Sequence, residues 1–369
     1  MAKPAFTIGV EEEYQIVDAQ TRSLTGRSNS LITTNEAAQI EQKIVHELFR
    51  CEVEIATNVC ETLEDVRQAL TAARRAVINA ARATGSEIAA AGTHPFSRWE
   101  EQQITPKERY YALHSDLGRI IRELIILGCH VHVGIDDKEM AVQVMNRARV
   151  WLPTLLALTA NSPFWEGQDT GYDSYRMALW SRLPTSGPPP FFDSYADYQS
   201  FIQQLINTGI TDDPTKIYWD IRLSERFPTV EFRMSDVCST IDEAVMLAGL
   251  VRALAHTCYN DAMRDKAAMP VRGEMMKAAM WRAARYGLSG ELIDFDKLQS
   301  IPARTSVSTL LEYVQPALTI YGDESVVIGE VERILAEGNS AQRQRQIYQE
   351  TKSLQTVVDE IVRRSALSV

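Results

Sequence analysis

FTIGVEEEYQIVD, residues 6–18, is a stretch in which apolar and polar side chains alternate. In an extended chain, one face carries Phe6, Ile8, Val10, Tyr14 and Ile16, and the other carries Thr7, Gly9, Glu11, Glu13 and Gln15. This period of two predicts a strand with one buried face. Glutamate is a poor strand former, so two glutamates on the polar face of a strand point to a function.

The same alternation recurs later in the chain. The segments that show it are 50–60, 128–135, 217–224 and 229–235. Their polar faces carry Glu52 and Glu54 (with Glu47 upstream), His130 and His132, Asp220 and Arg222, and Glu231 and Arg233. If these strands are neighbours in one sheet, their polar side chains line one cleft.

This set of residue types favours phosphoryl transfer. Two carboxylates about 4 Å apart repel by about 4 kcal/mol at an effective dielectric of 20, so a face with so many acids needs cations. Carboxylates with a single histidine suit Mg²⁺ or Mn²⁺, and arginine suits a phosphate or another planar oxyanion. Acids, arginines and divalent ions together are the equipment of phosphoryl transfer.

Each motif alone has a simpler interpretation. Glu11 to Glu13 could be a solvated face, the His-x-His pair could be packed histidines, and Glu231 and Arg233 could be a salt bridge within a strand. His46-Glu47 does not continue as a zinc-protease helix, because position 50 is arginine. The sequence also lacks both glycine-rich nucleotide-binding motifs, so a nucleotide would be held in another way.

The composition excludes some classes of protein. The chain has 369 residues, of which 45% are hydrophobic and 24% charged, and a net charge of -11. Such a charge argues against a general nucleic-acid binder, and the apolar runs are too short to span a membrane. The start of the sequence shows no signal-type segment, and its five cysteines have no paired short spacings. We therefore expect a cytoplasmic enzyme with reduced thiols.

The remaining pattern predicts an α+β fold with a mainly antiparallel or mixed sheet. Helices are expected over 62–84, 109–127, 136–161 and 195–207, with Pro153 bending the third, and from Thr240 almost to the end. Residues 162–194 are expected to form a long loop rich in aromatic side chains, which closes over the active site. The chain is expected to be a single catalytic domain, with the active-site sheet in 1–239 and a helical part, 240–369, packed on it.

Several motifs together resemble the type 2 glutamate–cysteine ligases, or carboxylate–amine ligases. The matching segments are GVEEEYQIVD at 9–18, CEVEIAT at 51–57 with Glu47 upstream, GCHVHVG at 128–134 and TVEFR at 229–233. WSRLP at 180–184 and WRAARYGL at 281–288 extend the resemblance, which runs from about Phe6 to the end.

The resemblance implies a glutamine synthetase-like fold: a curved, open-barrel-like sheet with helices outside and a helical C-terminal third. It also implies ATP and Mg²⁺ (or Mn²⁺). By motif position, Glu13, Glu47 and Glu54 would bind one metal ion, and Glu11, His130 and Glu231 a second. His132 would contact the nucleotide phosphates. Arg233 would face the transferred phosphoryl group with Arg222 as its helper, and Arg182 would clamp a substrate carboxylate.

The implied function is an ATP-dependent ligase. It would join a glutamate-like carboxylate to a cysteine-like amine through an acyl phosphate, releasing ADP and phosphate. The resemblance also suggests a homodimer. Two alternatives stay open: a metal-dependent kinase of the same superfamily with a nitrogen acceptor, and a non-catalytic regulator that binds metal or nucleotide.

Overall fold

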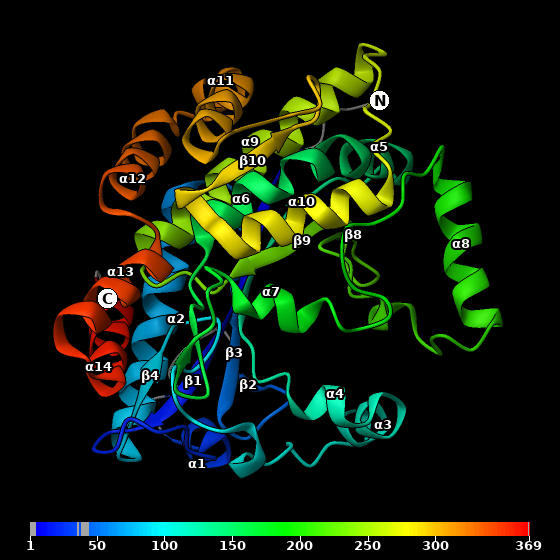
Figure 1. Cartoon of the computed structure of the whole chain (residues 1–369). Helices are drawn as coiled ribbons and strands as arrows, with labels where there is room; N and C mark the ends of the chain where they lie inside the picture. The colour runs from blue at the N-terminus through cyan, green and yellow to red at the C-terminus, as the bar shows by residue number, and fades with distance from the viewer. Residues whose placement is uncertain (1–4, 35–36, 38–43, 368) are drawn as a thin grey trace.

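The fold is built on one antiparallel sheet. A computed structural model describes residues 5–34, 37, 44–367 and 369 (Figure 1). Its seven-stranded sheet has the order β2-β3-β1-β5-β9-β8, and β4 also pairs with β1. The strands are β1 (Ile8–Asp18), β2 (Ile44–His46), β3 (Glu52–Ala56), β4 (Ser86–Ala89), β5 (Gly128–Gly134), β8 (Ile221–Leu223) and β9 (Thr229–Asp236). Every pairing in it is antiparallel, as expected from the sequence.

Strand β1 lies at the centre of the sheet and separates its two faces. Its residues Ile8, Val10 and Ile16 are buried in the main hydrophobic cluster. Glu12 also lies on this buried face, where its carboxylate pairs with Arg74 at 2.5 Å. A fully buried charge is tolerated only when it is paired, so this ion pair explains why an acid can stand on the apolar side.

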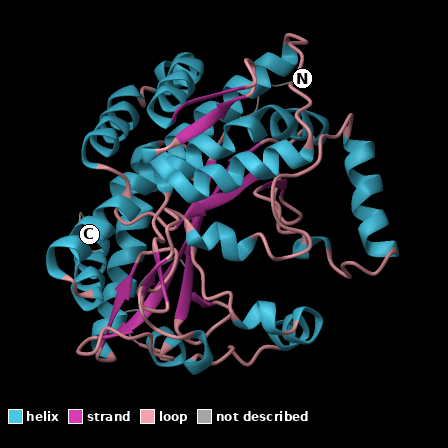
Figure 2. Ribbon diagram, viewed as in Figure 1, coloured by secondary structure: helices cyan, strands magenta, loops and turns pink. Residues whose placement is uncertain are grey.

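Helices cover the apolar face of the sheet. Helix α2 (Leu63–Ala83) begins at a capping box on Thr62, and α9 (Ile241–Met263) contacts β1, β5 and α2. Figure 2 shows helices above and to the left of the sheet, while on its right lie loops together with α3 (Glu108–Leu117), α4 (Arg119–Arg122), α7 (Tyr175–Trp180) and α8 (Tyr195–Asn207). The opposite face of the sheet is therefore the one that bears the polar side chains. None of the described helices combines the length and apolar character needed to cross a bilayer.

Several expected elements differ in the structure. The strands expected at 50–60 and 217–224 are shorter, namely β3 and β8. The helix expected at 109–127 is divided into α3 (Glu108–Leu117) and α4 (Arg119–Arg122), because Gly118 adopts a φ of +57°. The helix expected at 136–161 is α5 (Lys138–Ala148) and α6 (Leu152–Thr159), with Pro153 in the first turn of α6. Residues 162–194 are not a continuous loop, since they contain β6 (Phe164–Trp165), β7 (Gln168–Asp169) and α7 (Tyr175–Trp180).

The C-terminal part is helical with one exception. Helix α8 (Tyr195–Asn207) matches its expected range. After α9 follow α10 (Gly273–Tyr286), α11 (Ala303–Tyr321), α12 (Glu324–Glu337), α13 (Ser340–Thr351) and α14 (Leu354–Ser365). The exception is the hairpin of β10 (Glu291–Asp294) and β11 (Gln299–Pro302), where the Asp294 carboxylate accepts two backbone N–H bonds in the turn. Near the N-terminus, α1 (Ser28–Ile32) falls in a stretch to which the sequence assigns no element.

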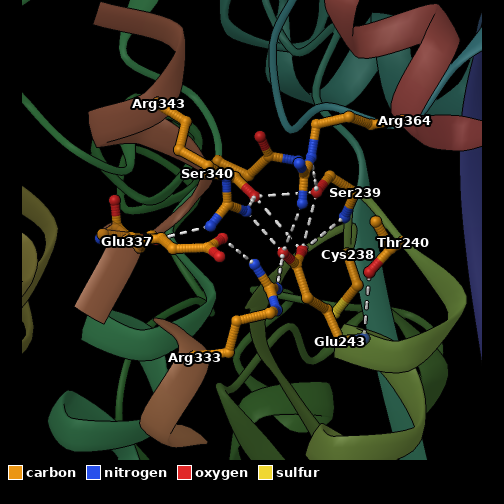
Figure 3. Close-up of polar contacts among 12 residues, drawn as sticks. Cys238, Ser239, Thr240, Glu243, Arg333, Glu337, Ser340, Arg343 and Arg364 are labelled. Carbon is orange, nitrogen blue, oxygen red and sulfur yellow. Dashed lines mark hydrogen bonds and ion pairs between the residues drawn. The ribbon is translucent and has the colours of Figure 1, made fainter. Parts of the chain in front are cut away.

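A buried carboxylate on α9 holds the last three helices against the rest of the chain. Glu243 Oε1 accepts hydrogen bonds from Arg333 of α12 (3.0 Å), Arg343 of α13 (2.5 Å) and Arg364 of α14 (3.5 Å) (Figure 3). Its Oε2 accepts from the Ser239 hydroxyl at 2.8 Å. Burial acts to raise the pKa of Glu243, but the arginines outweigh it and lower the pKa to about 2.

We propose that the strand-bearing part, residues 1–239, and the helical part, residues 240–369, unfold as one unit. The cluster around Glu243 provides a test. Glu243→Gln should lower the free energy of unfolding by about 3 kcal/mol, because three arginines lose their shared buried carboxylate. Asp242→Asn, a change at a half-buried neighbour that pairs with Arg67, should cost under about 1 kcal/mol. Urea unfolding followed by circular dichroism measures the free energy of unfolding of both variants. We expect each variant to unfold in a single transition. Equal losses, or two separate transitions, would contradict the proposal.

Candidate active site

The polar face of the sheet opens into a cleft of about 450 Å³. Nine of the ten residues to which the resemblance assigns a role line it: Glu11, Glu13, Glu47, Glu54, His130, His132, Arg222, Glu231 and Arg233. The strand registers explain this convergence. Glu13 lies opposite Glu54, Glu11 opposite His130, and Glu231 between His132 and Arg222.

Glu13, Glu47 and Glu54 form the first group of possible metal ligands. Each offers a carboxylate oxygen, and these oxygens lie within 4.8 Å of one another. Glu47 follows β2, and its backbone carbonyl accepts a hydrogen bond from the Thr105 hydroxyl at 2.7 Å. The backbone N–H of Gly128 donates to Glu13 Oε2 at 2.6 Å. The group is thus held by the sheet and by backbone contacts.

Glu11, His132 and Glu231 form the second group, and their ligand atoms also lie within 4.8 Å of one another. The sequence resemblance had implied His130 in place of His132. His130 lies between the two groups, with Nδ1 3.2 Å from Glu11 Oε2 and Nε2 4.0 Å from Glu13 Oε1. The Thr229 hydroxyl contacts His132 Nδ1 at 3.0 Å, which turns His132 Nε2 toward Glu11. Which histidine binds a metal ion stays a prediction.

The electrostatics of the two groups differ. Burial, and then the charge of Glu47, raises the pKa of Glu13 to about 7. Burial and Glu47 also raise the pKa of Glu54. In the second group, burial acts to raise the pKa of Glu11, but the two histidines outweigh it and lower that pKa. Burial lowers the pKa of His130 to about 4, so its imidazole is neutral at pH 7 and free to act as a ligand.

Two arginines bracket Glu231. Arg222 Nε donates to Glu231 Oε2 at 2.7 Å, and Arg233 pairs with Glu231 Oε1. Burial acts to raise the pKa of Glu231, but Arg233 and then Arg222 outweigh it, and the pKa falls. Arg233 also lies over the ring of Trp180, 5.8 Å from its centroid. Both guanidinium groups are therefore fixed beside the second group, where they could bind the oxygens of a phosphate.

Arg182 is the one of these ten residues that does not line the cleft, and Asp220, also expected on this face, is fully buried outside it. Its Nη1 pairs with Glu123 Oε2 at 2.5 Å, and its side chain is 34% exposed. The cleft-lining arginine of this segment is Arg176, which is 2% exposed and lies 5.8 Å from the Trp180 ring. The sequence analysis missed Arg176 because it expected a loop here. The spacing of four residues between Arg176 and Trp180, typical of one helix face, was the available signal.

Arg176 is a buried cation with weak partners. Its guanidinium donates to the backbone carbonyls of Arg233 (3.3 Å) and Met234 (3.4 Å). Among the described residues it forms no ion pair with a carboxylate within 4.0 Å. Burial lowers the pKa of Arg176, and the carboxylates of Asp236 and Glu13 oppose this without forming an ion pair, so an anionic ligand in the cleft would be a closer partner.

The donor set fits divalent cations. The first group is all carboxylate, and the second adds one imidazole, which are ligands that Mg²⁺ and Mn²⁺ accept. His130 Nε2 is buried and makes no hydrogen bond within the described part of the chain, and His132 Nε2 has only the Glu11 carboxylate near it, at 3.4 Å. Buried polar atoms normally have a partner, so these two nitrogens also fit a ligand in the cleft.

Comparisons with known proteins now decide the family. The model of glutamate–cysteine ligase family 2 matches residues 7–360. The chain is a member of this family. It is 41% identical over 366 residues to a protein of Rhodopirellula baltica, with 98% of each chain covered. A protein of Sorangium cellulosum is 40% identical over 365 residues, which cover 99% of this chain and 97% of that one. Both relatives carry the name glutamate–cysteine ligase 2 as a provisional assignment.

Comparison with solved structures identifies the fold of this family 2 member. The glutamate–cysteine ligase of Francisella tularensis, solved with AMP, superposes with a TM-score of 0.71 at 13% identity, covering 100% of this chain and 90% of that one. A bifunctional glutathione synthetase of Pasteurella multocida gives 0.70 at 15% identity, covering 98% and 52%. The fold is that of the glutamine synthetase-like ligases, with an open sheet. Family membership makes the chain an ATP-dependent carboxylate–amine ligase that forms carbon–nitrogen bonds.

The clustered acids give this family member a testable pH dependence. Folding raises the pKa of Glu13 from 4.5 to about 7, so the folded state binds more protons than the unfolded state between these values. The contribution of Glu13 to stability should therefore fall by on the order of 3 kcal/mol as the pH rises from about 4.5 to about 7. His130, whose pKa is lowered to about 4, contributes the opposite slope over the same range, so the loss is measured as the stability of the wild type relative to Glu13→Gln. Denaturant unfolding in EDTA measures this loss. Repeating it in 10 mM Mg²⁺ should remove the loss, because a ligand that binds only the folded state stabilises it. A pH-independent difference between the wild type and Glu13→Gln in EDTA, or no effect of Mg²⁺ or Mn²⁺, would contradict the metal site.

Proposed function

We propose that the enzyme joins a glutamate-like carboxylate to an amine through an acyl phosphate. The carboxylate oxygen would attack the terminal phosphorus of ATP, forming a C–O–P linkage and releasing ADP. The amine would then attack the acyl carbon, so that the C–O bond breaks, phosphate leaves and the nitrogen loses a proton. Phosphorylation is needed because a free carboxylate is a poor acyl donor.

One observation carries this proposal: two groups of ligand atoms lie in one cleft beside three arginines. Bound divalent cations would neutralise the polyphosphate and orient it. We infer that Glu13, Glu47 and Glu54 hold one cation, and that Glu11 and Glu231 hold another with His130 or His132. Such a set suits a reaction in which several phosphate charges are brought together.

The residues of the chain would act mainly by position and charge. Arg233 and Arg222, fixed by Glu231, would bind the oxygens of the transferred phosphoryl group, where charge develops during transfer. Arg176 would offset the charge of the donor carboxylate, in place of the clamp expected at Arg182. Trp180, held between Arg176 and Arg233, would shield the acyl phosphate from water.

ADP release with three substrate sets tests the proposal. Glutamate with an amine should give sustained release, and either substrate alone should give little. A metal-dependent kinase would give release with a nitrogen acceptor alone and leave a phosphorylated product. A regulator without catalysis would bind ATP and release no ADP under any condition, and either outcome would overturn the ligase mechanism.

A further inference from the structure

One end of the cleft has an apolar wall that phosphate chemistry does not require. Six aliphatic side chains line it: Leu48, Leu113, Ile121, Leu124, Ile126 and Leu183. All are 4–8% exposed and belong to the second hydrophobic cluster of the protein. They come from the turn after β2, from α3 and α4, from the segment before β5 and from the segment after α7. We call this surface the apolar wall.

The apolar wall adjoins the group of Glu13, Glu47 and Glu54. Leu48 follows Glu47 directly, and Ile126 lies two residues before Gly128, whose N–H binds Glu13. The Tyr110 hydroxyl, from the same α3 helix as Leu113, donates to the backbone carbonyl of residue 46 at 3.2 Å. Burial, and then the charges of Glu47 and Glu54, raises the pKa of Tyr110, which places its hydroxyl near these carboxylates.

Polar contacts hold the wall in place across the cleft. Glu123, just after α4, pairs with Arg182 at 2.5 Å. Asp116 of α3 lies 3.6 Å from Lys216 Nζ, and Arg109 Nη2 donates to the Thr215 hydroxyl at 3.3 Å. In Figure 1, α3 and α4 project beside β2, away from the main helical layers. These contacts join the projecting helices to the opposite side of the cleft, so the wall is formed before any substrate binds.

Charge separates the two ends of the cleft. The carboxylates of Glu47, Glu52 and Glu54 lie beside the apolar wall, whereas Arg222 and Arg233 lie at the end formed by β8 and β9. A donor carboxylate is attracted to the arginines, and an amine arrives as a cation. The arginines repel such a cation from their own end, so the acceptor amine suits the end that bears the wall. Lys107 and Arg109, at the exposed rim of this end, could pair with a carboxylate on the same molecule.

We infer that the acceptor is an amino acid whose apolar side chain, of leucine size or larger, packs against the apolar wall. This inference rests on the proposed ligase function and names its acceptor class. The small side chain of cysteine would leave most of the wall uncovered. Because each additional buried methylene changes discrimination by tenfold or more in a fitted pocket, the preference should be large.

ADP release at saturating glutamate and Mg²⁺ATP tests the inference with four acceptors: cysteine, 2-aminobutyrate, leucine and phenylalanine. Leucine or phenylalanine should show a kcat/KM at least tenfold above that of both small acceptors. If cysteine is the best acceptor, the inference is overturned and the ligase proposal stands. If glutamate supports ADP release with none of the four acceptors, both the inference and the ligase proposal are overturned.

Two variants at neighbouring positions show whether the wall causes the preference. Leu124 lines the cleft, whereas Ile125 belongs to the same hydrophobic cluster without lining it. Leu124→Ala should reduce the ratio of kcat/KM for leucine over 2-aminobutyrate about fivefold or more, mainly through KM. Ile125→Ala should lower the melting temperature to a similar extent and leave this ratio unchanged. Equal ratios in both variants would overturn the inference, whatever their stability.

Discussion

Arg233→Ala should lower turnover about a hundredfold or more. Arg233 is 9% exposed, lines the cleft and pairs with Glu231, so its guanidinium has a fixed place beside the second ligand group. A group that binds the transferring phosphoryl strengthens its contacts in the transition state, so its loss should fall on kcat. Nucleotide affinity should fall much less, because Arg222, His132 and bound metal ions remain.

The measurements for Arg233 are steady-state turnover and nucleotide binding, each at two Mg²⁺ concentrations. Arg22→Ala is the control, since Arg22 pairs with Asp359, does not line the cleft and should keep near-normal turnover. Arg233→Lys should recover part of the lost rate, because it restores the charge without the planar fork. Near-normal turnover of Arg233→Ala would indicate that Arg233 only forms a salt bridge within its strand and takes no part in catalysis.

Glu54→Ala should lower the activity of the enzyme and raise the stability of the metal-free protein. At about 1 mM Mg²⁺ we expect activity to fall about a hundredfold, and excess Mn²⁺ should restore part of it, since a weakened site needs a tighter-binding ion. Burial and Glu47 raise the pKa of Glu54, so its ionised form is unfavourable in the folded protein without metal. At pH 8 in EDTA, the variant should therefore melt about 2 °C or more above the wild type.

Activity titrations with both ions, and melting curves in EDTA, measure these effects. Glu87→Ala is the matched control, because Glu87 lies on β4 of the same sheet, outside the cleft, and pairs with Arg82. This control should change neither the metal requirement nor the activity. A Glu54→Ala enzyme with an unchanged metal requirement would remove Glu54 from the proposed ligands.

The period-two pattern predicted the faces of the strands and therefore most of the cleft. Once one face of a strand is buried, a slip of one residue would expose the whole apolar set, so parity is strongly specified. Glu13 and Glu54 lie opposite each other for this reason, although the strand order was not predictable from the pattern. The register of β5 against β9 shifts by one residue between Cys129 and Val131. The shift places His132 opposite Glu231, where the unshifted register would place Val133.

Features that depend on short helices and on tertiary contacts were not predicted. Helix α7 spans six residues, too few for a clear 3.6-residue period, so Arg176 was not recognised as a cleft residue. The break at Gly118 separates α3 from α4, and a helical pattern tolerates a single glycine without showing such a break. The partner of Arg182 is Glu123, 59 positions away in the chain, which no local pattern indicates.

Transfer of oxygen from the donor carboxylate to phosphate tests the central claim most directly. Glutamate labelled with ¹⁸O in its side-chain carboxylate would be incubated with Mg²⁺ATP, the best acceptor amine and the enzyme. If an acyl phosphate forms and the amine displaces phosphate, one ¹⁸O atom appears in each phosphate released and one remains in the amide. Mass spectrometry measures the ¹⁸O content of the released phosphate. Phosphate without ¹⁸O, formed while the amide accumulates, would contradict the account.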